Sequence, residues 1–158
     1  MNAGWIILLT FGIGFVGGLR SMTAPAVVAW AAHLGWIGLA GSPLAFMGSR
    51  WAVAIWTVFA LGEFIGDLLP KTPARTAPMP LIVRIVIGLL TGGCLAIAGG
   101  IALWIGALIG GIGAVAGAFG GYQARAGLVR AFHVQDFVIA IPEDLVAIGL
   151  GLLLVSRY

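Results

Sequence analysis

Charged residues are scarce in this sequence: Asp, Glu, Lys and Arg make up 8% of its 158 residues. A water-soluble domain usually carries about 25% charged residues. The rest of the chain is strongly apolar, with 61% hydrophobic residues, and a protein with so apolar a surface would not stay dispersed in water. The composition excludes an ordinary soluble domain and indicates a protein that lies in a lipid bilayer.

Cysteine is almost absent as well. Cys94 is the single one and stands in an apolar run, so it cannot form an internal disulfide and makes a poor metal site. No metal-ligand spacing, nucleophile–base arrangement or phosphate loop occurs in the chain. The net charge of +3 is modest and scattered, which does not suggest nucleic-acid binding. We expect no metal, no cofactor and no nucleic-acid partner.

Long polar stretches are also missing, so residues 1–158 are predicted to form a single transmembrane domain. Six apolar segments approach the ~20 residues that a helix needs to cross a bilayer core of ~30 Å. No obvious cleavage site follows the first segment, which is therefore interpreted as a span and not as a signal peptide. The second segment is short and could instead be re-entrant. The segments are residues 5–19, 25–39, 51–69, 80–99, 101–121 and 137–155.

The positive charges are distributed unevenly over the connections between these segments. If all six segments cross, the connections 1–2, 3–4 and 5–6 lie on one side, and the opposite side holds only Arg50 and Arg157. Basic connections stay in the cytoplasm, which places both termini in the periplasm of a bacterial inner membrane. The sequence thus predicts an all-α, polytopic integral membrane bundle of about six helices in three hairpins. The residues on the basic side are Arg20, Lys71, Arg75, Arg84, Arg125 and Arg130.

Glycine, by contrast, is abundant, with 26 residues. Several glycines are spaced four apart, which lets helix backbones approach closely in lipid. Tight packing within the monomer is the simpler explanation, and a homo-oligomer, most simply a dimer, is the alternative. The spaced glycines are Gly14/Gly18, Gly88/Gly92, Gly106/Gly110 and Gly113/Gly117/Gly121.

All five acidic residues lie in the cytoplasmic half of the bundle in this six-span topology. Glu63 lies roughly 10 Å inside its helix, and Asp67 follows at i+4 on the same face. Arg84 lies one turn inside its own segment, where it could meet either acid. In the last segment Pro142 precedes Glu143 and Asp144 and is expected to break or kink the helix. Broken helices at membrane depth often form ligand sites.

The run from Gly17 to Ala26 contains a second candidate feature. Ser21 or Thr23 can cap the helix that Pro25 begins, and Arg20 beside a helix N-terminus suits phosphate or carboxylate binding. The alternatives are an ordinary interhelical turn, and ion pairs that only hold the bundle together. The predicted substrate-binding residues are Arg20, Ser21, Thr23, Glu63, Asp67, Arg84, Arg125, Glu143 and Asp144.

Four runs of the chain resemble one known family. They are GGLRSMTAPAVVAWAAHLGW, GEFIGDLLPKTPARTAPMPLIVRI, GAVAGAFGGYQAR and IPEDLVAIGLGLLLVS. With these runs the chain resembles the bacterial membrane family catalogued as domain of unknown function 4126. The resemblance implies a small multi-helix membrane protein and implies no activity. The matching positions include Arg20, Thr23, Pro25, Glu63, Asp67, Pro70, Lys71, Arg75, Arg84, Glu143 and Asp144.

The leading functional hypothesis is a small transporter or channel-like protein, oligomeric in the bilayer, that moves a small solute or ion through a charged, cytoplasm-facing cavity. Raised carboxylate pKa values in such a low-dielectric cavity would suit proton coupling. One alternative is a membrane enzyme acting on a lipid phosphate, with Arg20 gripping the phosphate. Glu63-Phe64 and Arg20-Ser21 are faintly similar to stretches of undecaprenyl-pyrophosphate phosphatases, but the full pattern is missing. The other alternative is a non-catalytic partner subunit, and an enzyme is the less favoured class.

Overall fold

The computed structural model describes residues 2–67, 76–133 and 136–158. Within these residues the chain forms six α-helices and one short 3-10 helix, without any β-strand. The all-helical fold predicted from the sequence is confirmed. The elements are α1 (Ala3–Leu19), α2 (Thr23–His33), η1 (Ala45–Gly48), α3 (Arg50–Asp67), α4 (Pro78–Ala98), α5 (Leu103–Phe132) and α6 (Asp136–Val155).

Three helices in the described part of the chain are long and apolar enough to cross a membrane. They are Pro78–Ala98, Leu103–Phe132 and Val138–Val155, and Ala3–Leu19 is a shorter apolar helix. α3 has 18 residues but carries three charges, on Arg50, Glu63 and Asp67. By length and composition, then, the fold contains membrane-type helices, although fewer than the six that the sequence predicts.

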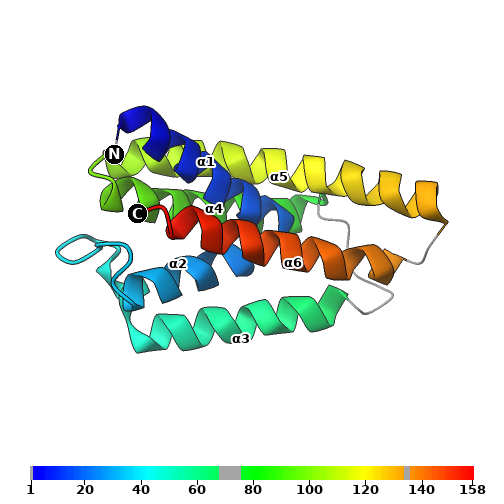
Figure 1. The fold of residues 1–158 in the computed structure, drawn as a ribbon, viewed down its shortest axis with the longest axis horizontal. Helices are drawn as coiled ribbons and strands as arrows, with labels where there is room; N and C mark the ends of the chain where they lie inside the picture. The colour runs from blue at the N-terminus through cyan, green and yellow to red at the C-terminus, as the bar shows by residue number, and fades with distance from the viewer. Residues whose placement is uncertain (1, 68–75, 134–135) are drawn as a thin grey trace.

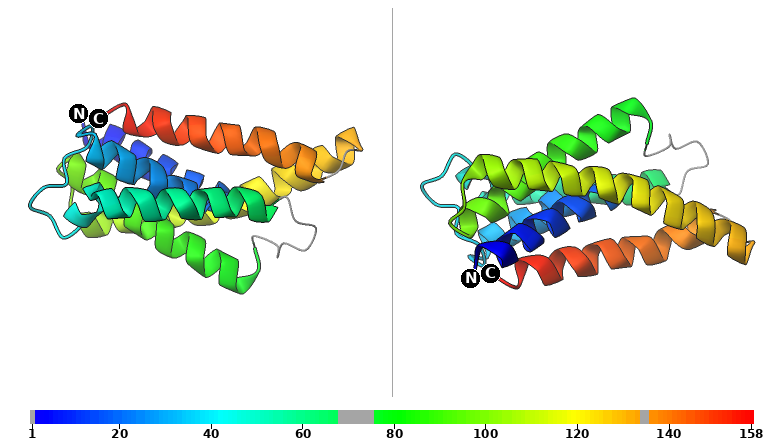
Figure 2. Two further views of the ribbon diagram at one scale, coloured as in Figure 1. Left: turned by 90° about the horizontal axis from the view of Figure 1, so that it is seen from below. Right: turned by 90° about the horizontal axis from the view of Figure 1, so that it is seen from above.

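Successive helices run in alternate directions along the long axis of the molecule (Figure 1). Both termini lie at one end, which we call the terminal end (Figures 1 and 2). Arg50, at the start of α3, and Arg157, beyond the end of α6, belong to this end. The α1–α2 turn points toward the opposite end, and both α5 and α6 extend beyond it (Figures 1 and 2). Because α5 and α6 extend beyond it, the α1–α2 turn lies inside the bundle and not at its end.

Glycines allow α1, α4 and α5 to pack most closely of all the helices. A Cβ atom added to Gly14 would collide with the backbone of Gly110 in α5, and one added to Gly18 would collide with the backbone at Ala114 and Gly117. Helix backbones can approach this closely only where no side chain intervenes. Packing within one chain therefore accounts for the four-residue glycine spacing on α1.

The second predicted segment, residues 25–39, is not one continuous helix. α2 ends at His33, and an 11-residue helix is only about 16 Å long, well short of a bilayer core. Gly35 has a positive φ of 76°, Gly35 N–H bonds to Ala32 O, and Trp36 N–H bonds to Ala31 O at 2.8 Å. These contacts form a Schellman motif, which ends a helix even within an apolar sequence.

The fifth predicted segment, residues 101–121, is shorter than the helix that the structure contains there. α5 continues through Phe132 and ends at His133, which has a left-handed φ of 53°. Residues 122–132 are more polar than the preceding turns but include good helix formers such as Ala, Gln and Arg. Hydropathy marks where a helix leaves an apolar environment, which need not be where the helix ends.

Candidate functional site

The α1–α2 turn is the centre of the polar residues in the bundle. α1 stops at Leu19 and α2 starts at Thr23. Arg20 is only 1% exposed and Ser21 is 6% exposed, although a three-residue turn between helices usually lies at a surface. Side chains from α3 and α6 reach this turn, and one from α4 reaches the last turn of α1 directly before it. The site is therefore assembled from five helices, none of which carries it alone.

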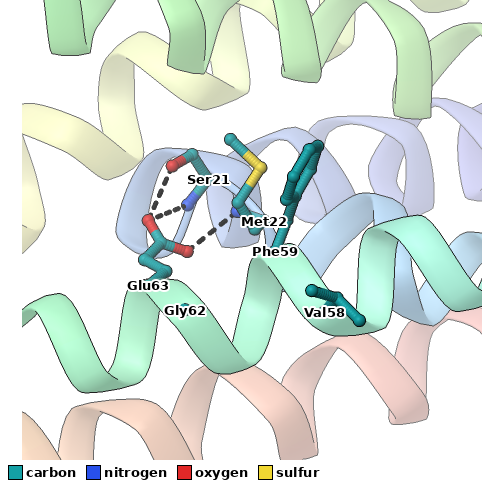
Figure 3. A pocket seen from close by; sticks show the side chains of 6 residues that line it. All are labelled: Ser21, Met22, Val58, Phe59, Gly62 and Glu63. Atoms are coloured by element: carbon teal, nitrogen blue, oxygen red, sulfur yellow. Dashed lines mark hydrogen bonds between the residues drawn. The ribbon is translucent and has the colours of Figure 1, made fainter.

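Glu63 of α3 caps the N-terminus of α2. Its Oε1 accepts hydrogen bonds from the Ser21 amide at 2.9 Å and the Ser21 hydroxyl at 2.6 Å, and its Oε2 accepts from the Met22 amide at 2.8 Å (Figure 3). The first N–H groups of a helix have no partner within the helix, and the helix dipole favours an anion there. A carboxylate from another helix thus serves as the cap of this short helix.

Arg84 of α4 completes this part of the site. Its Nε donates to the carbonyl oxygen of Gly18 at 3.0 Å, and Nη1 lies 3.5 Å from the carbonyl oxygen of Pro80. Its Nη2 lies 3.9 Å from Oε1 of Glu63. The Gly18 carbonyl is one of the last in α1 and so lacks a partner inside that helix. Arg84 therefore joins the end of α1 to α3 and α4.

Arg20 forms an ion pair with Asp144 of α6, Nη2 to Oδ1. Its guanidinium carbon also lies 5.7 Å from the centre of the Phe64 ring, a distance at which a cation is attracted by the face of an aromatic ring. Because Arg20 is almost fully buried, these contacts replace its hydration. Arg20 thus connects the turn to α6 and α3.

A second ion pair links α5 to α6. Nη1 of Arg125 lies 3.6 Å from Oε2 of Glu143. Glu143 precedes Asp144 on α6, so the two acids project about 100° apart and reach different partners. Both Arg125 and Glu143 have side chains that are mostly buried. The extension of α5 beyond Gly121 is what brings Arg125 within reach of α6.

The charges in this cluster balance. The charge cluster is our name for two buried residues, Arg20 and Arg84, and four half-buried ones, Glu63, Arg125, Glu143 and Asp144; it holds three guanidinium groups and three carboxylates. Transferring an ion from water into a low-dielectric interior costs several kcal/mol, which only a close partner offsets. Balanced pairing is therefore the condition under which these groups can remain ionised inside a membrane protein.

A groove opens beside α3 and leads to the charge cluster. Its volume is about 530 Å³, and it is lined by Ser21, Met22, Val58, Phe59, Gly62 and Glu63 (Figure 3). Val58 is 64% exposed and Phe59 is 51% exposed. The groove thus connects the outer face of the bundle with the carboxylate that caps α2.

The comparisons with known proteins identify the family. Residues 7–156 match the family described as domain of unknown function 4126. The chain belongs to this family. No curated protein and no solved structure matches the chain. The family resemblance noted in the sequence is therefore confirmed, and the family description names no activity.

The charge cluster contains five of the eleven positions by which the chain resembles this family. The structure brings together Arg20, Ser21, Glu63, Arg84 and Asp144 around the α1–α2 turn, with the Arg125–Glu143 pair beyond them. Thr23 lies buried in the first turn of α2, and its hydroxyl has no hydrogen-bond partner among the described residues. The side chain of Asp67, and all of Pro70, Lys71 and Arg75, lie outside the described residues.

Of the break or kink expected at Pro142 in the sixth segment, the break is contradicted by the structure. Pro142 does not break the helix, because α6 runs continuously from Asp136 to Val155 with Pro142 inside it. Proline is tolerated within membrane helices when neighbouring groups or small local adjustments satisfy the freed backbone carbonyl. Glu143 and Asp144 therefore project from a continuous helix, and α6 does not contribute a broken segment to the site.

The sequence reasoning missed three groups that shape the site: the Phe64 ring, the Gly18 carbonyl and the Phe59 side chain. For Gly18 a signal existed, because the final carbonyls of any helix need outside donors. For the two aromatic residues no local signal exists, since any apolar residue on α3 is equally compatible with lipid.

Proposed function

We propose that this protein is a small membrane transporter that moves a small solute or ion past the charge cluster at the α1–α2 turn. In this proposal α3 to α6 cross a bacterial inner membrane, and α1 and α2 form a shorter hairpin between them. Both termini then lie in the periplasm, and the basic half of the bundle faces the cytoplasm, in agreement with the positive-inside rule. The observation that carries the proposal is the buried helix N-terminus of α2 held by Glu63.

Two physical arguments support a transport role. Ionisable groups within membrane segments are costly and usually mark a pathway for ions or protons. Transporters also use short helices whose N-termini end inside the bundle, where the free N–H groups face a substrate. α2 has this form: it is 11 residues long, and the N–H groups of Ser21 and Met22, directly before its first turn, point at a carboxylate from another helix.

Movement would begin at the contact between Glu63 and α2. α3 lies at the edge of the bundle (Figure 1) and packs mainly on α2, with smaller contacts to η1 and α6. Protonation of Glu63 would remove the charge that the α2 N-terminus holds and weaken the three hydrogen bonds. A proton that binds Glu63 would in this way separate α3 from α2, and this separation is the proposed route for proton coupling.

We propose a homodimer as the working assembly, because so few helices make a thin wall around a pathway.

A non-catalytic partner subunit is the second candidate. The observation that favours it is the balance of the charge cluster, which would fix the bundle without any ligand. The lipid-phosphate enzyme is favoured less, because it needs Arg20 at the surface to grip a phosphate. Arg20 is buried and paired with Asp144.

A reconstitution experiment tests the transport proposal. The purified full chain, in liposomes, is offered phosphate, small carboxylates, halides, and monovalent and divalent cations, and uptake is followed at two pH values. Glu63→Gln should abolish uptake of the transported solute, and Arg157→Gln, at the exposed terminal end, should leave it unchanged. Uptake that survives in Glu63→Gln refutes the mechanism.

Two further readouts separate the other candidates. Co-purification with a larger complex, with no uptake by the isolated protein, would favour the partner subunit. Release of phosphate from a polyprenyl pyrophosphate, lost in Arg20→Ala, would favour the enzyme. A thermal-shift screen of the same panel supports each result, because a ligand at a hundredfold excess over its Kd stabilises the folded state by about 2.7 kcal/mol.

A further inference from the structure

We infer that the groove beside α3 binds an organic cation with an apolar body, and that the Glu63 carboxylate is its counter-ion. The inference rests on the proposed function, since the cation would be the transported solute, and it adds the chemical class of that solute. Four observations carry it: the size of the groove, the chemistry of its walls, the remaining acceptor capacity of Glu63, and the exposed side of the groove.

The groove is large enough for a small organic molecule. Its volume of about 530 Å³ falls within the range of roughly 300–1,000 Å³ found for ligand pockets. Met22, Val58 and Phe59 supply apolar walls, and Ser21 and Glu63 supply the polar end (Figure 3). A ligand that fits such a site carries an apolar body and one polar group, because the polar surface is confined to one end.

Glu63 retains the capacity to accept one more hydrogen bond. A carboxylate offers about four acceptor positions on its two oxygens. Oε1 accepts from both the amide and the hydroxyl of Ser21, while Oε2 accepts from the Met22 amide alone. Met22 also lines the groove, so the oxygen with remaining capacity lies toward it (Figure 3). An N–H or ammonium group of a ligand can occupy this position.

Charge decides between a cation and an anion. Six of the described residues line the groove, and among these six Glu63 is the one that carries a charge. Arg84 approaches the other carboxylate oxygen, Oε1, at 3.9 Å, and Arg20 is paired with Asp144. An anion in the groove would therefore meet a carboxylate first, whereas a cation would meet both that carboxylate and the Phe59 ring, whose face attracts cations.

The exposed side of the groove defines how such a ligand arrives. Val58 and Phe59 form the outer part of the lining and are more than half exposed. In the proposed membrane orientation this face of α3 borders lipid. Cations with large apolar bodies partition into the bilayer, so the groove receives them from the side, near the end of α3 where Glu63 lies.

The test uses two ions of the same shape and opposite charge. Binding of labelled tetraphenylphosphonium and of labelled tetraphenylborate to the purified full chain in detergent is measured by equilibrium dialysis, and binding to empty micelles is subtracted. Tetraphenylphosphonium should bind saturably and tetraphenylborate should not. Glu63→Gln should weaken cation binding at least tenfold, and Glu63→Asp should weaken it less because the charge remains.

A second variant keeps the test decisive if Glu63→Gln does not fold. Phe59→Ala removes a wall of the groove and none of the hydrogen bonds of Glu63, and it should weaken cation binding severalfold. Phe119→Ala, at an exposed phenylalanine of α5, is the matched control and should bind normally. Equal binding of the two ions overturns the inference, and so does cation binding that Phe59→Ala leaves unchanged.

Combining these data with liposome uptake separates the two proposals. Charge-selective binding that depends on Phe59, without Glu63-dependent uptake of an organic cation or of any other solute offered, supports the cation site and removes the transport role. Uptake of another solute that requires Glu63, without binding of tetraphenylphosphonium, supports the transport role and overturns the cation site.

Discussion

Replacing Arg20 by methionine should destabilise the folded protein strongly, since it removes the guanidinium group that pairs with the Asp144 carboxylate. Arg20 is 1% exposed, and the Asp144 side chain is 18% exposed. Removing one member of a buried ion pair typically costs about 3–5 kcal/mol, because the remaining charge stays buried. Loss of the contact between Arg20 and Phe64 adds about 0.5–2 kcal/mol. We expect a total near the middle of the first range, because Asp144 keeps some contact with solvent.

The double variant Arg20→Met, Asp144→Leu should recover most of this loss. Replacing a whole buried pair by apolar side chains of similar volume is often neutral or even stabilising. The double variant should therefore be more stable than Arg20→Met alone, and a double-mutant cycle should give a coupling energy well above the ~0.3–0.5 kcal/mol error of additivity.

The assay is unfolding of the purified protein in mixed micelles, followed by tryptophan fluorescence, with each variant measured at the same detergent concentration. If Arg20→Met lowered the free energy of unfolding by less than about 1 kcal/mol, the pair would behave as an exposed ion pair does. That result would contradict the burial of the turn. A double variant no more stable than the single variant would contradict the pairing.

Three further predictions concern packing, the C-terminus and topology. Gly14→Ala should lower the yield of folded protein, because the added Cβ would collide with the α5 backbone. Gly127→Ala, whose added Cβ meets no atom within 4 Å, should stabilise its helix by about 0.5–1 kcal/mol. Melting temperatures in micelles should fall for the first variant and rise for the second. The Tyr158 hydroxyl donates to an α4 carbonyl at 2.7 Å, and burial raises its pKa to about 12 from 10.0, against an opposing hydrogen bond. The contribution of the protonated Tyr158 hydroxyl to stability should thus be complete below about pH 10 and be lost as the pH rises toward 12. Tyr158→Phe should lack this loss of stability at alkaline pH, and an identical decline of stability in both proteins would contradict the prediction. Cysteines introduced for Arg130 and Arg157 should react with a membrane-impermeant thiol reagent from opposite sides of the membrane, and labelling from one side would contradict the proposed orientation.

Features that depend on the local properties of one segment could be predicted from the sequence. The residues of α1 and α4 prefer an apolar environment over nearly their whole length, so their predicted bounds lie within two residues of the observed ones. The glycine spacing on α1 likewise predicted close packing, because only a residue without a side chain permits it. The positions of Glu63 and Arg84 within their segments predicted that the two lie at a similar depth, and their side chains do meet.

Other features of the molecule depend on contacts between distant parts of the chain. Hydropathy could not show that α2 ends at His33, because Gly35 ends the helix through backbone conformation within an apolar run. Hydropathy also could not show that α5 continues far enough to bring Arg125 to Glu143. Such distances follow from helix lengths and from how the helices pack.

The sequence by itself determined that this protein lies in a membrane as a bundle of helices, since the preference of a segment for lipid is the sum of its own side chains. The tertiary structure alone decided the partner of each charge. Glu63 was expected to meet a basic side chain, and it holds the backbone amides of Ser21 and Met22 as well, while Arg20 pairs with Asp144, far away in the chain. A buried charge is stabilised by whichever groups the packed helices bring within a few ångströms, and periodicity within one helix carries no information about that neighbour.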